Sequence, residues 1–234
     1  MKLKSLLAAV LFVPSTMVLA SPILIHQYDF NGSGVTDLVG TENGTLVGGA
    51  TVSGGKLVLD GSNDWVDFSA ALVPLSGDFS VQFDAQGFPQ NNGLYTEMIS
   101  QGGGFYIGYD PAHNFRFSDT YLSTGLGFPN DNLTHNYLLT SSASGTSFYI
   151  DYTLVFSGGA QLHPTNTDTR LGRQYGPHAE YFPGNIDNVS IYQGAFSIDE
   201  VHAPVSGVPD SGSTVAFLTM AGAGMVAFRR RQRA

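Results

Sequence analysis

The stretch DFSVQFDA, residues 78–85, decides the fold class of this chain. Apolar and polar side chains alternate along it, so Phe79, Val81, Phe83 and Ala85 share one face of an extended backbone. An α-helix, with about 3.6 residues per turn, would scatter the same four side chains around its axis. The stretch therefore predicts a β-strand that buries one face in a core and exposes the other.

Less regular alternation predicts further strands, separated by turns rich in Gly, Asn and Ser. The additional predicted strands cover residues 23–30, 56–60, 95–100, 104–109, 114–117, 136–141, 146–154, 169–172 and 186–192. One helical turn is expected at 197–201, where Ser197 and Glu200 form a capping box. Many short antiparallel strands, each with one apolar face, predict an all-β, two-sheet antiparallel sandwich.

The charge distribution restricts the partners of the folded part. Ten Lys and Arg face nineteen Asp and Glu, and only Lys56, Arg116, Arg170 and Arg173 lie between the two basic ends of the chain. Phosphate groups would be repelled by so acidic a domain, so nucleic acid is excluded as a partner, whereas cations and neutral ligands are favoured. The chain has no cysteine, which excludes disulfide bonds and thiolate metal sites.

Residues 1–20 have the order of a secretory signal peptide. Lys2 and Lys4 precede an apolar run, and Val18-Leu19-Ala20 supplies the small-residue pattern of a cleavage site. Cleavage after Ala20 and export of the protein are therefore predicted. An uncleaved membrane anchor is the alternative, although the apolar run is short for a membrane span.

The C-terminal segment, residues 208–234, has three parts. The motif Val208-Pro209-Asp210-Ser211-Gly212 follows a linker at 203–207 and precedes an uncharged run at 213–228. An arginine cluster closes the segment and contains Arg229, Arg230 and Arg231. As a helix, the uncharged run would reach roughly 24 Å, which is shorter than a bilayer core of about 30 Å, so it spans only marginally. The arginines would stay on the cytoplasmic side by the positive-inside rule.

The order of these three parts resembles the VPDSG variant of the PEP-CTERM sorting signals. The resemblance implies a Gram-negative cell envelope, in which an exosortase-type membrane enzyme recognises the motif. It implies that the enzyme then delivers the protein to the outer surface or the extracellular matrix. It also implies that the C-terminal helix tethers the chain to the inner membrane only transiently. An ordinary tail anchor is the alternative, because the hydropathy pattern alone is the same.

Residues 25–201 carry a second resemblance. Its motifs are Tyr28-Asp29-Phe30, Asn43-Gly44-Thr45-Leu46, Phe148-Tyr149-Ile150-Asp151 and the stretches at 57–61, 79–83 and 181–192. They resemble the laminin-G-like, concanavalin A-like jelly rolls of bacterial secreted proteins, and the predicted domain spans residues 21–202. Two positions depart from the family pattern. Tyr152 replaces a glycine after Asp151, so that this hairpin turn must be built differently, and the usual tryptophan is absent near 135–137.

The residue patterns of common hydrolases are missing from the sequence. Glycoside hydrolysis normally needs two carboxylates that flank the scissile bond. None of Glu42, Glu97, Glu180 and Glu200 has a second carboxylate two residues away on the same strand face, and the histidines are not spaced as metal ligands. The domain is therefore predicted not to be an enzyme, and a glycoside hydrolase is the least favoured function.

A loop near the end of the domain is the candidate ligand site, because sugar sites combine exposed aromatic side chains with polar groups. The candidate residues are Arg173, Tyr175, His178, Glu180 and Tyr181. Trp65, the only tryptophan, is a further candidate. The alternative is that these aromatic side chains pack in or over the core.

Asp187 is the candidate metal ligand. Alternation with Val189 and Ile191 places its carboxylate on the inward face, where it needs hydrogen bonds or a cation. Structural Ca²⁺ would suit it, because calcium takes carboxylate and amide oxygens. In the sandwiches that this domain resembles the last strand lies beside the first, which implies Asp29, Asp37 and Asn43 as further ligands. The alternative is that Asp187 only caps backbone N–H groups.

Together these features predict an exported surface or matrix protein. Its sandwich would act as a binding, adhesion or scaffolding module, with an extracellular polysaccharide or a surface protein as partner. A carbohydrate-binding lectin module is the alternative.

Overall fold

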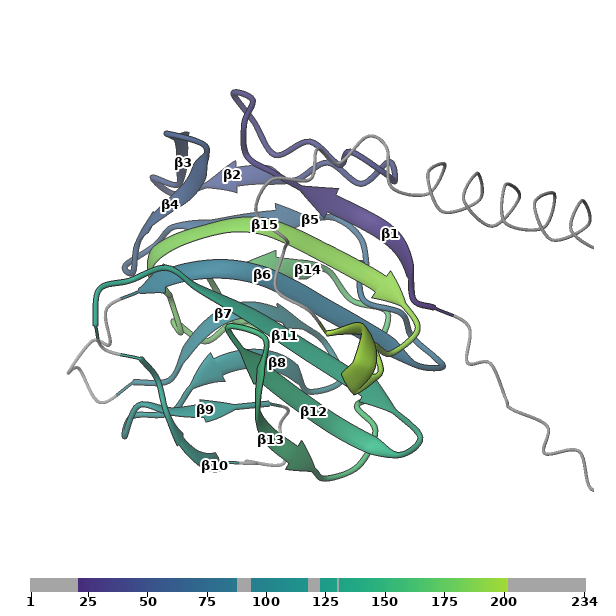
Figure 1. The fold of residues 1–234 in the computed structure, drawn as a ribbon. Helices are drawn as coiled ribbons and strands as arrows, with labels where there is room; N and C mark the ends of the chain where they lie inside the picture. The colour runs from purple at the N-terminus through teal and green to yellow at the C-terminus, as the bar shows by residue number, and fades with distance from the viewer. Residues whose placement is uncertain (1–20, 88–93, 118–122, 130, 202–234) are drawn as a thin grey trace, which may run out of the picture. The chain divides into compact units, whose positions relative to one another are not determined.

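A computed structural model describes residues 21–87, 94–117, 123–129 and 131–201 (Figure 1). The predicted signal peptide, the linker and the sorting segment lie outside the described residues. Fifteen strands and one short 3₁₀ helix, η1 at Ile198–Glu200, make up the regular structure of the described part. No helix in these ranges is long and apolar enough to cross a bilayer.

Two antiparallel sheets confirm the predicted jelly-roll sandwich. The eight-stranded sheet contains β1 (Ile23–Tyr28), β3 (Thr51–Ser53), β4 (Lys56–Asp60), β6 (Phe79–Gly87), β11 (His135–Ser142), β12 (Gly145–Ile150), β13 (Thr153–Gly158) and β15 (Pro183–Gln193). The seven-stranded sheet contains β2 (Thr45–Val47), β5 (Trp65–Phe68), β7 (Thr96–Gln101), β8 (Phe105–Tyr109), β9 (Asn114–Arg116), β10 (Ser123–Gly127) and β14 (Thr169–Leu171). Their orders are β13-β12-β11-β6-β15-β4-β3, with β1 also beside β15, and β10-β9-β8-β7-β14-β5-β2.

β6, which contains the stretch quoted first, lies in the middle of the eight-stranded sheet. Its residues Phe79, Val81, Phe83 and Ala85 are at most 1% exposed, as the alternation predicts. On one side β6 pairs with β11, and on the other with nearly the whole of β15. The predicted core face is therefore confirmed.

Aromatic rings fill the space between the sheets. The Phe115 ring of β9 lies 5.6 Å from the Tyr137 ring of β11 and 5.0 Å from the Phe148 ring of β12, measured between centroids. At the other side of the core, the Tyr28 and Phe68 rings are 4.9 Å apart. Tilted pairs at these distances are favourable beyond the area that they bury.

A β-bulge in β15 overturns one expectation from the sequence. Alternation counted back from Val189 placed Asp187 inward, but Asn188 has a φ of 49° and the register of β15 against β6 shifts after Asp187. Ile186 takes the inward position and is 1% exposed. Asp187 lies opposite Asp84 and shares its outer face. The inward orientation predicted for Asp187 is therefore wrong.

The bulge lies where β15 changes its neighbour. On the side away from β6, Pro183–Ile186 pair with β4, whereas Val189–Gln193 pair with β1. One extra residue between these two halves lets a single long strand follow both neighbours. Asp187 and Asn188 thus lie at the junction of β4 and β1.

The segment 146–154, predicted as one strand, is two strands joined by the turn Asp151-Tyr152. Both turn residues have positive φ, 48° and 63°, as a two-residue type I′ hairpin requires. Asp151 supports the turn, since one carboxylate oxygen accepts from Asn136 N at 2.9 Å and the other lies 2.7 Å from His135 Nδ1. Tyr152 lacks such a role, and a left-handed conformation costs a non-glycine residue about 1 kcal/mol.

Replacing Tyr152 tests this strain. We expect the Tyr152→Gly variant to be more stable than the Tyr152→Ala variant by about 1 kcal/mol, because only glycine adopts positive φ without a steric cost. Urea unfolding of both variants measures the difference in free energy of unfolding. At the neighbouring strand position Thr153 the order should reverse, with alanine ahead of glycine. Equal stability of the two Tyr152 variants would show that the turn stores no strain.

Candidate functional site

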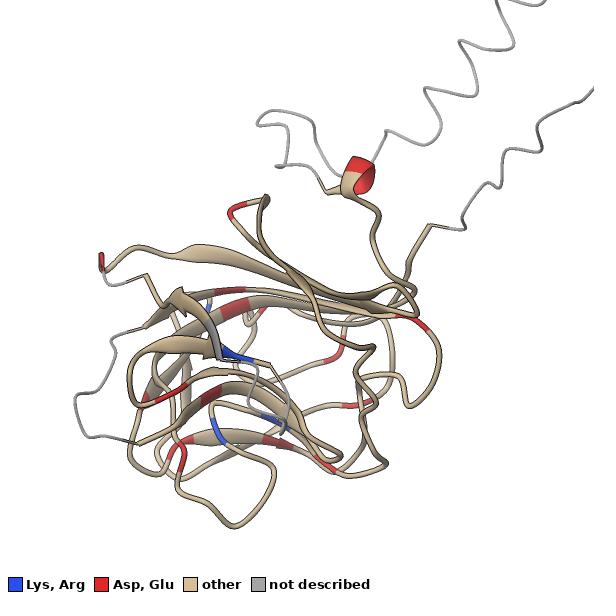
Figure 2. Cartoon of the chain, turned by 90° about the horizontal axis from the view of Figure 1, so that it is seen from below, with Lys and Arg blue, Asp and Glu red and all other residues tan. Residues whose placement is uncertain are grey.

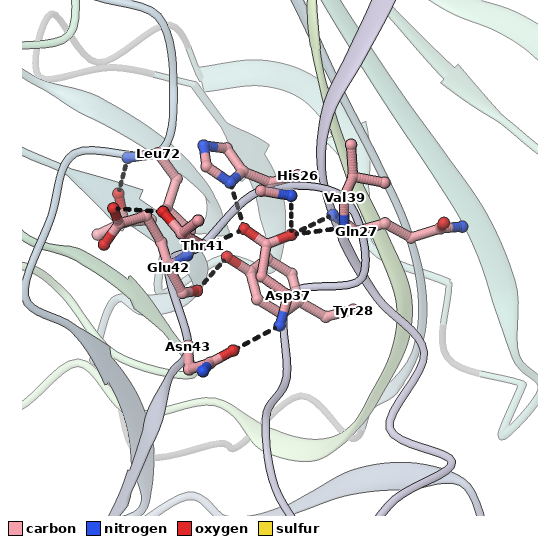
Figure 3. Close-up of polar contacts among 11 residues, drawn as sticks. His26, Gln27, Tyr28, Asp37, Val39, Thr41, Glu42, Asn43 and Leu72 are labelled. Atoms are coloured by element: carbon pink, nitrogen blue, oxygen red, sulfur yellow. Dashed lines mark hydrogen bonds and ion pairs between the residues drawn. The ribbon is translucent and has the colours of Figure 1, made fainter.

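Asp37, one of the predicted calcium ligands, is the centre of a hydrogen-bonded loop between β1 and β2 (Figure 3). Its side chain is fully buried. Oδ1 accepts from the backbone N–H groups of Gln27, Val39 and Gly40 at 2.9–3.2 Å. Oδ2 accepts from Glu42 N at 3.2 Å and lies 2.6 Å from Nδ1 of a histidine.

That histidine is His26, and its Nδ1 carries a proton here because an ionised carboxylate can only accept. Burial alone would raise the pKa of Asp37, but the hydrogen bonds from His26, Gly40 and Gln27 outweigh it and lower the pKa to about 2. Asn43 closes the same loop, since its Oδ1 accepts from Asp37 N at 2.9 Å. The Asp37 carboxylate and the Asn43 side-chain oxygen are therefore both engaged in hydrogen bonds that hold the loop.

This arrangement leaves Asp37 and Asn43 poorly suited to bind calcium, because a metal would have to displace the N–H donors. Asp29 hydrogen-bonds Asn31, and Asp187 accepts from Asn188 N at 2.8 Å. Burial raises the pKa of Asp187, and the charges of Asp84 and Asp29 raise it further. Within the described ranges, no group of three or more His, Asp or Glu side chains could hold a metal ion. Calcium at Asp187 stays a prediction.

The outer face of the seven-stranded sheet holds the other candidate residues. Val66 and Phe68 of β5 are buried in the core, so the alternating residues Trp65 and Asp67 point outward and are partly exposed. Arg170 of β14 lies opposite Asp67, and its Nε donates to the Asp67 carboxylate at 3.0 Å. The loop from β14 to β15 begins beside this ion pair.

Arg173 on this loop lies over two aromatic rings that also contact each other, with 6.1 Å between the centroids of Trp65 and Tyr181. Its guanidinium carbon lies 4.5 Å from the centroid of Trp65 and 5.3 Å from that of Tyr181. Tyr181 forms an isolated β-bridge with Arg173, and the Arg173 carbonyl accepts from Ser100 Oγ at 2.7 Å. All three members of this stack are partly exposed. The structure thus brings together Arg173, Tyr181 and the separately noted Trp65.

The remaining loop residues occupy different positions. The Tyr175 ring lies 5.7 Å from that of Tyr106, which is buried on the outer side of β8. Glu180 is bound to Arg116 of β9, with 2.9 Å between Oε2 and Nη2. His178 is exposed. We call the outer surface formed by Trp65, Arg173, Tyr175 and Tyr181 the Arg173 face.

Sequence reasoning missed one ion pair below this face. The buried Glu97 of β7 contacts the same Arg116 nitrogen as Glu180 does, and the guanidinium also lies 4.3 Å from the centroid of Tyr95. The strands of these two residues, β7 for Glu97 and β9 for Arg116, lie on either side of β8. Both residues are paired with Gly108 of β8, so they are neighbours across it. Two opposite charges on apolar strands were the signal available in the sequence.

The comparison with known families agrees with this architecture. Residues 60–202 match the profile of the concanavalin A-like lectin/glucanases superfamily, Laminin_G_3. The chain belongs to this superfamily. No curated protein sequence matches it significantly.

Solved structures resemble this superfamily member at low sequence identity. Domain 4 of AbnA, a GH43 extracellular arabinanase from Geobacillus stearothermophilus in complex with arabinotriose, is 19% identical with a TM-score of 0.63, over 78% of this chain and 98% of that one. Trypanosoma rangeli sialidase is 15% identical with a TM-score of 0.60, over 76% of this chain and 32% of the sialidase. The binding domain of Paraclostridial Mosquitocidal Protein 1 is 17% identical with a TM-score of 0.60, over 76% and 51%. Identities this low show a shared fold only.

Asp37 provides a test of the loop that it organises. We expect Asp37→Asn to lower the free energy of unfolding by about 2–4 kcal/mol at pH 7, because the amide cannot accept from all five donors. The wild type should lose about 2 kcal/mol as the pH falls from about 4 to 2, since its folded pKa is depressed and protonation removes the stabilised charge. The variant should lack this contribution.

Chemical denaturation between pH 2 and 7 measures both effects. Asp168→Asn, at an exposed position, is the matched control and should change stability by less than about 0.5 kcal/mol. An Asp37→Asn variant as stable as this control would show that the carboxylate does not organise the loop.

Proposed function

We propose that this protein is an exported, non-catalytic carbohydrate-binding module that holds an extracellular polysaccharide on its Arg173 face. The observation that carries the proposal is the stack of Trp65, Arg173 and Tyr181, partly exposed on the outer side of a sheet. The proposal rests on the geometry and exposure of these rings. It does not rest on the likeness to the arabinanase domain, because 19% identity shows only a shared fold.

The chemistry of the Arg173 face suits a sugar ring. A pyranose presents C–H groups on its flat faces and hydroxyls around its edge, so aromatic rings cover the first and polar groups bind the second. Tyr175 and Tyr181 supply ring surfaces and hydroxyls, and Arg173 supplies N–H donors. The cation–π contacts hold the guanidinium in place before a ligand arrives, which reduces the entropy lost on binding.

The two carboxylates that pair with Arg116 favour a site that binds a polysaccharide without hydrolysing it. A glycosidase needs one carboxylic acid that gives up a proton and one free carboxylate. Glu97 is fully buried, and Glu97 and Glu180 both contact the guanidinium of Arg116. Ion pairs of this kind keep both carboxylates engaged with Arg116. We therefore expect the purified protein to retain polysaccharide without releasing reducing ends.

The location of the module completes the proposal. Residues 1–20 would direct export, and residues 208–234 would be recognised by an exosortase-type enzyme that moves the protein from the inner membrane to the cell surface or matrix. Adhesion or matrix scaffolding through a bound polysaccharide would follow. The proposed export and sorting rest on the sequence alone, because both segments lie outside the described residues.

Substitution of the two rings tests the site. We expect Trp65→Ala and Tyr181→Ala each to weaken polysaccharide binding at least about tenfold, since losing one stacking ring costs on the order of 1.4 kcal/mol. Affinity electrophoresis in gels that contain each member of a polysaccharide panel measures the change. Tyr152→Ala, which removes a partly exposed ring from the hairpin on the other sheet, is the control. A wild type that is retarded by no polysaccharide would leave a purely structural module as the function.

Deletion of residues 208–234 tests the sorting role. We expect the truncated protein to appear in the culture medium with the same melting temperature as the full-length protein, because the motif and apolar run lie after the last strand, β15. Immunoblots of cell and medium fractions and thermal unfolding by circular dichroism measure the two outcomes. A truncated domain that unfolds would show that the tail belongs to the fold.

A further inference from the structure

Four Lys and Arg side chains lie between the ends of the chain, and two of them are already neutralised by ion pairs. Figure 2 shows how sparsely Lys and Arg are distributed among Asp and Glu. Arg170 is paired with Asp67, and Arg116 with Glu97 and Glu180. Arg173 is different, because its guanidinium makes no ion pair and no hydrogen bond with any residue that the structure describes.

Two buried N–H donors, one on Arg173 and one on Trp65, have no hydrogen-bond acceptor among the described residues. The Nε of Arg173 is buried and has no acceptor, and the indole Nε1 of Trp65, against which Arg173 stacks, is buried without an acceptor as well. Burial of a donor without a partner is unfavourable. The contacts with two rings stabilise the positive charge but satisfy none of its N–H groups. An acceptor with a negative charge at the exposed side of the guanidinium would pair with this charge.

The nearby carboxylates do not supply that acceptor. Asp67 lies on the same face, but its Oδ1 accepts from Arg170, whose Nη1 also donates to the carbonyls of Gln174 and Gly176. Glu180 is adjacent in sequence to Tyr181, yet its carboxylate is bound to Arg116. Each acidic group around Arg173 therefore has a different arginine, and the charge of Arg173 is left for a ligand.

We propose that Arg173 selects an acidic sugar, and that its guanidinium binds the carboxylate of a uronic-acid residue whose ring stacks on Trp65 or Tyr181. A guanidinium matches a carboxylate with two parallel N–H···O bonds, so the pairing also fixes the orientation of the sugar. This inference rests on the proposed function and adds the class of ligand to it.

The negative net charge of the domain further restricts the class of polysaccharide that it can bind. Four basic residues between the chain ends face an excess of acidic ones within a net charge of −9. Such a field repels a densely charged polyanion at long range, whereas one carboxylate in contact with Arg173 is attracted locally. The fitting partner is thus a polysaccharide with widely spaced uronic acids, such as a glucuronoxylan, and not a polyuronate. Rising salt should weaken its binding only slightly.

Matched polymers test the selection directly. Glucuronoxylan, xanthan and alginate are each prepared in native form and with their carboxylates reduced to alcohols, and binding to the full-length protein is measured by calorimetry and affinity electrophoresis. We expect the wild type to bind native glucuronoxylan or xanthan about tenfold or more tightly than the reduced polymer, because a charged hydrogen-bonded pair contributes about 1.5–3 kcal/mol. Alginate, which is densely charged, should bind more weakly.

Three substitutions separate recognition of the carboxylate from packing against the rings. Arg173→Met keeps a long side chain over the rings and should lose the preference, so that the native and the reduced polymer bind equally. Lys56→Met removes a positive charge from the eight-stranded sheet and should keep the preference. Thermal unfolding of both variants shows whether the fold is retained, and Arg173→Lys provides a second variant that keeps the charge without the planar fork.

The possible results are distinct. Equal binding of native and reduced polymers by the wild type would overturn the role of Arg173 and leave the carbohydrate-binding function standing. Binding to none of the six preparations would contradict the proposed function itself. A preference that survives in both Arg173→Met and Arg173→Lys would place the carboxylate elsewhere on the protein and also overturn the inference.

Discussion

Contact between the two sheets through aromatic rings is the interaction on which the rest of the molecule depends. Phe115 reaches from the seven-stranded sheet to Tyr137 and Phe148 of the opposite sheet, and Phe79 meets Phe105 in the same way, with 5.7 Å between their centroids. Without disulfide bonds or a described metal centre, packing of these rings supplies the driving force that closes the sandwich. Both outer faces are then free to carry polar groups.

The Arg173 face is positioned by backbone contacts that begin at this core. Gly172 donates to the carbonyl of Met98 and accepts from Phe182 N, so both ends of the loop are fixed to the fold. Gly172 has a φ of 82°, a conformation that L residues rarely adopt, and a Cβ there would meet Leu59. A loop that is fixed at both ends presents its aromatic rings at a constant separation, which a flat sugar surface requires.

The sequence predicted the sandwich and most of its strands because alternation depends only on neighbours within a strand. It brought together part of the candidate Arg173 face, since Arg173, Tyr175 and Tyr181 lie close together in the chain, but not Trp65. It could not predict the pair Glu97–Arg116, because two strands must first be placed beside β8. It misplaced Asp187 because the bulge at Asn188 depends on β15 having two different neighbours on one edge. Local periodicity contains no information about such changes of partner.

The position of β15 has a consequence for when the protein folds. It is the last strand in the described part of the chain, yet it lies inside the eight-stranded sheet and pairs with β1, β4 and β6. Residues 23–28 therefore find their partner only after residues 189–193 have been synthesised, and pairing over such sequence separations is slow. A nascent chain with this topology can form its local hairpins early, such as β7-β8 and β11-β12, but β1 stays unpaired until β15 has been synthesised. In the export that we propose, this delay would leave closure of the sandwich to the far side of the membrane.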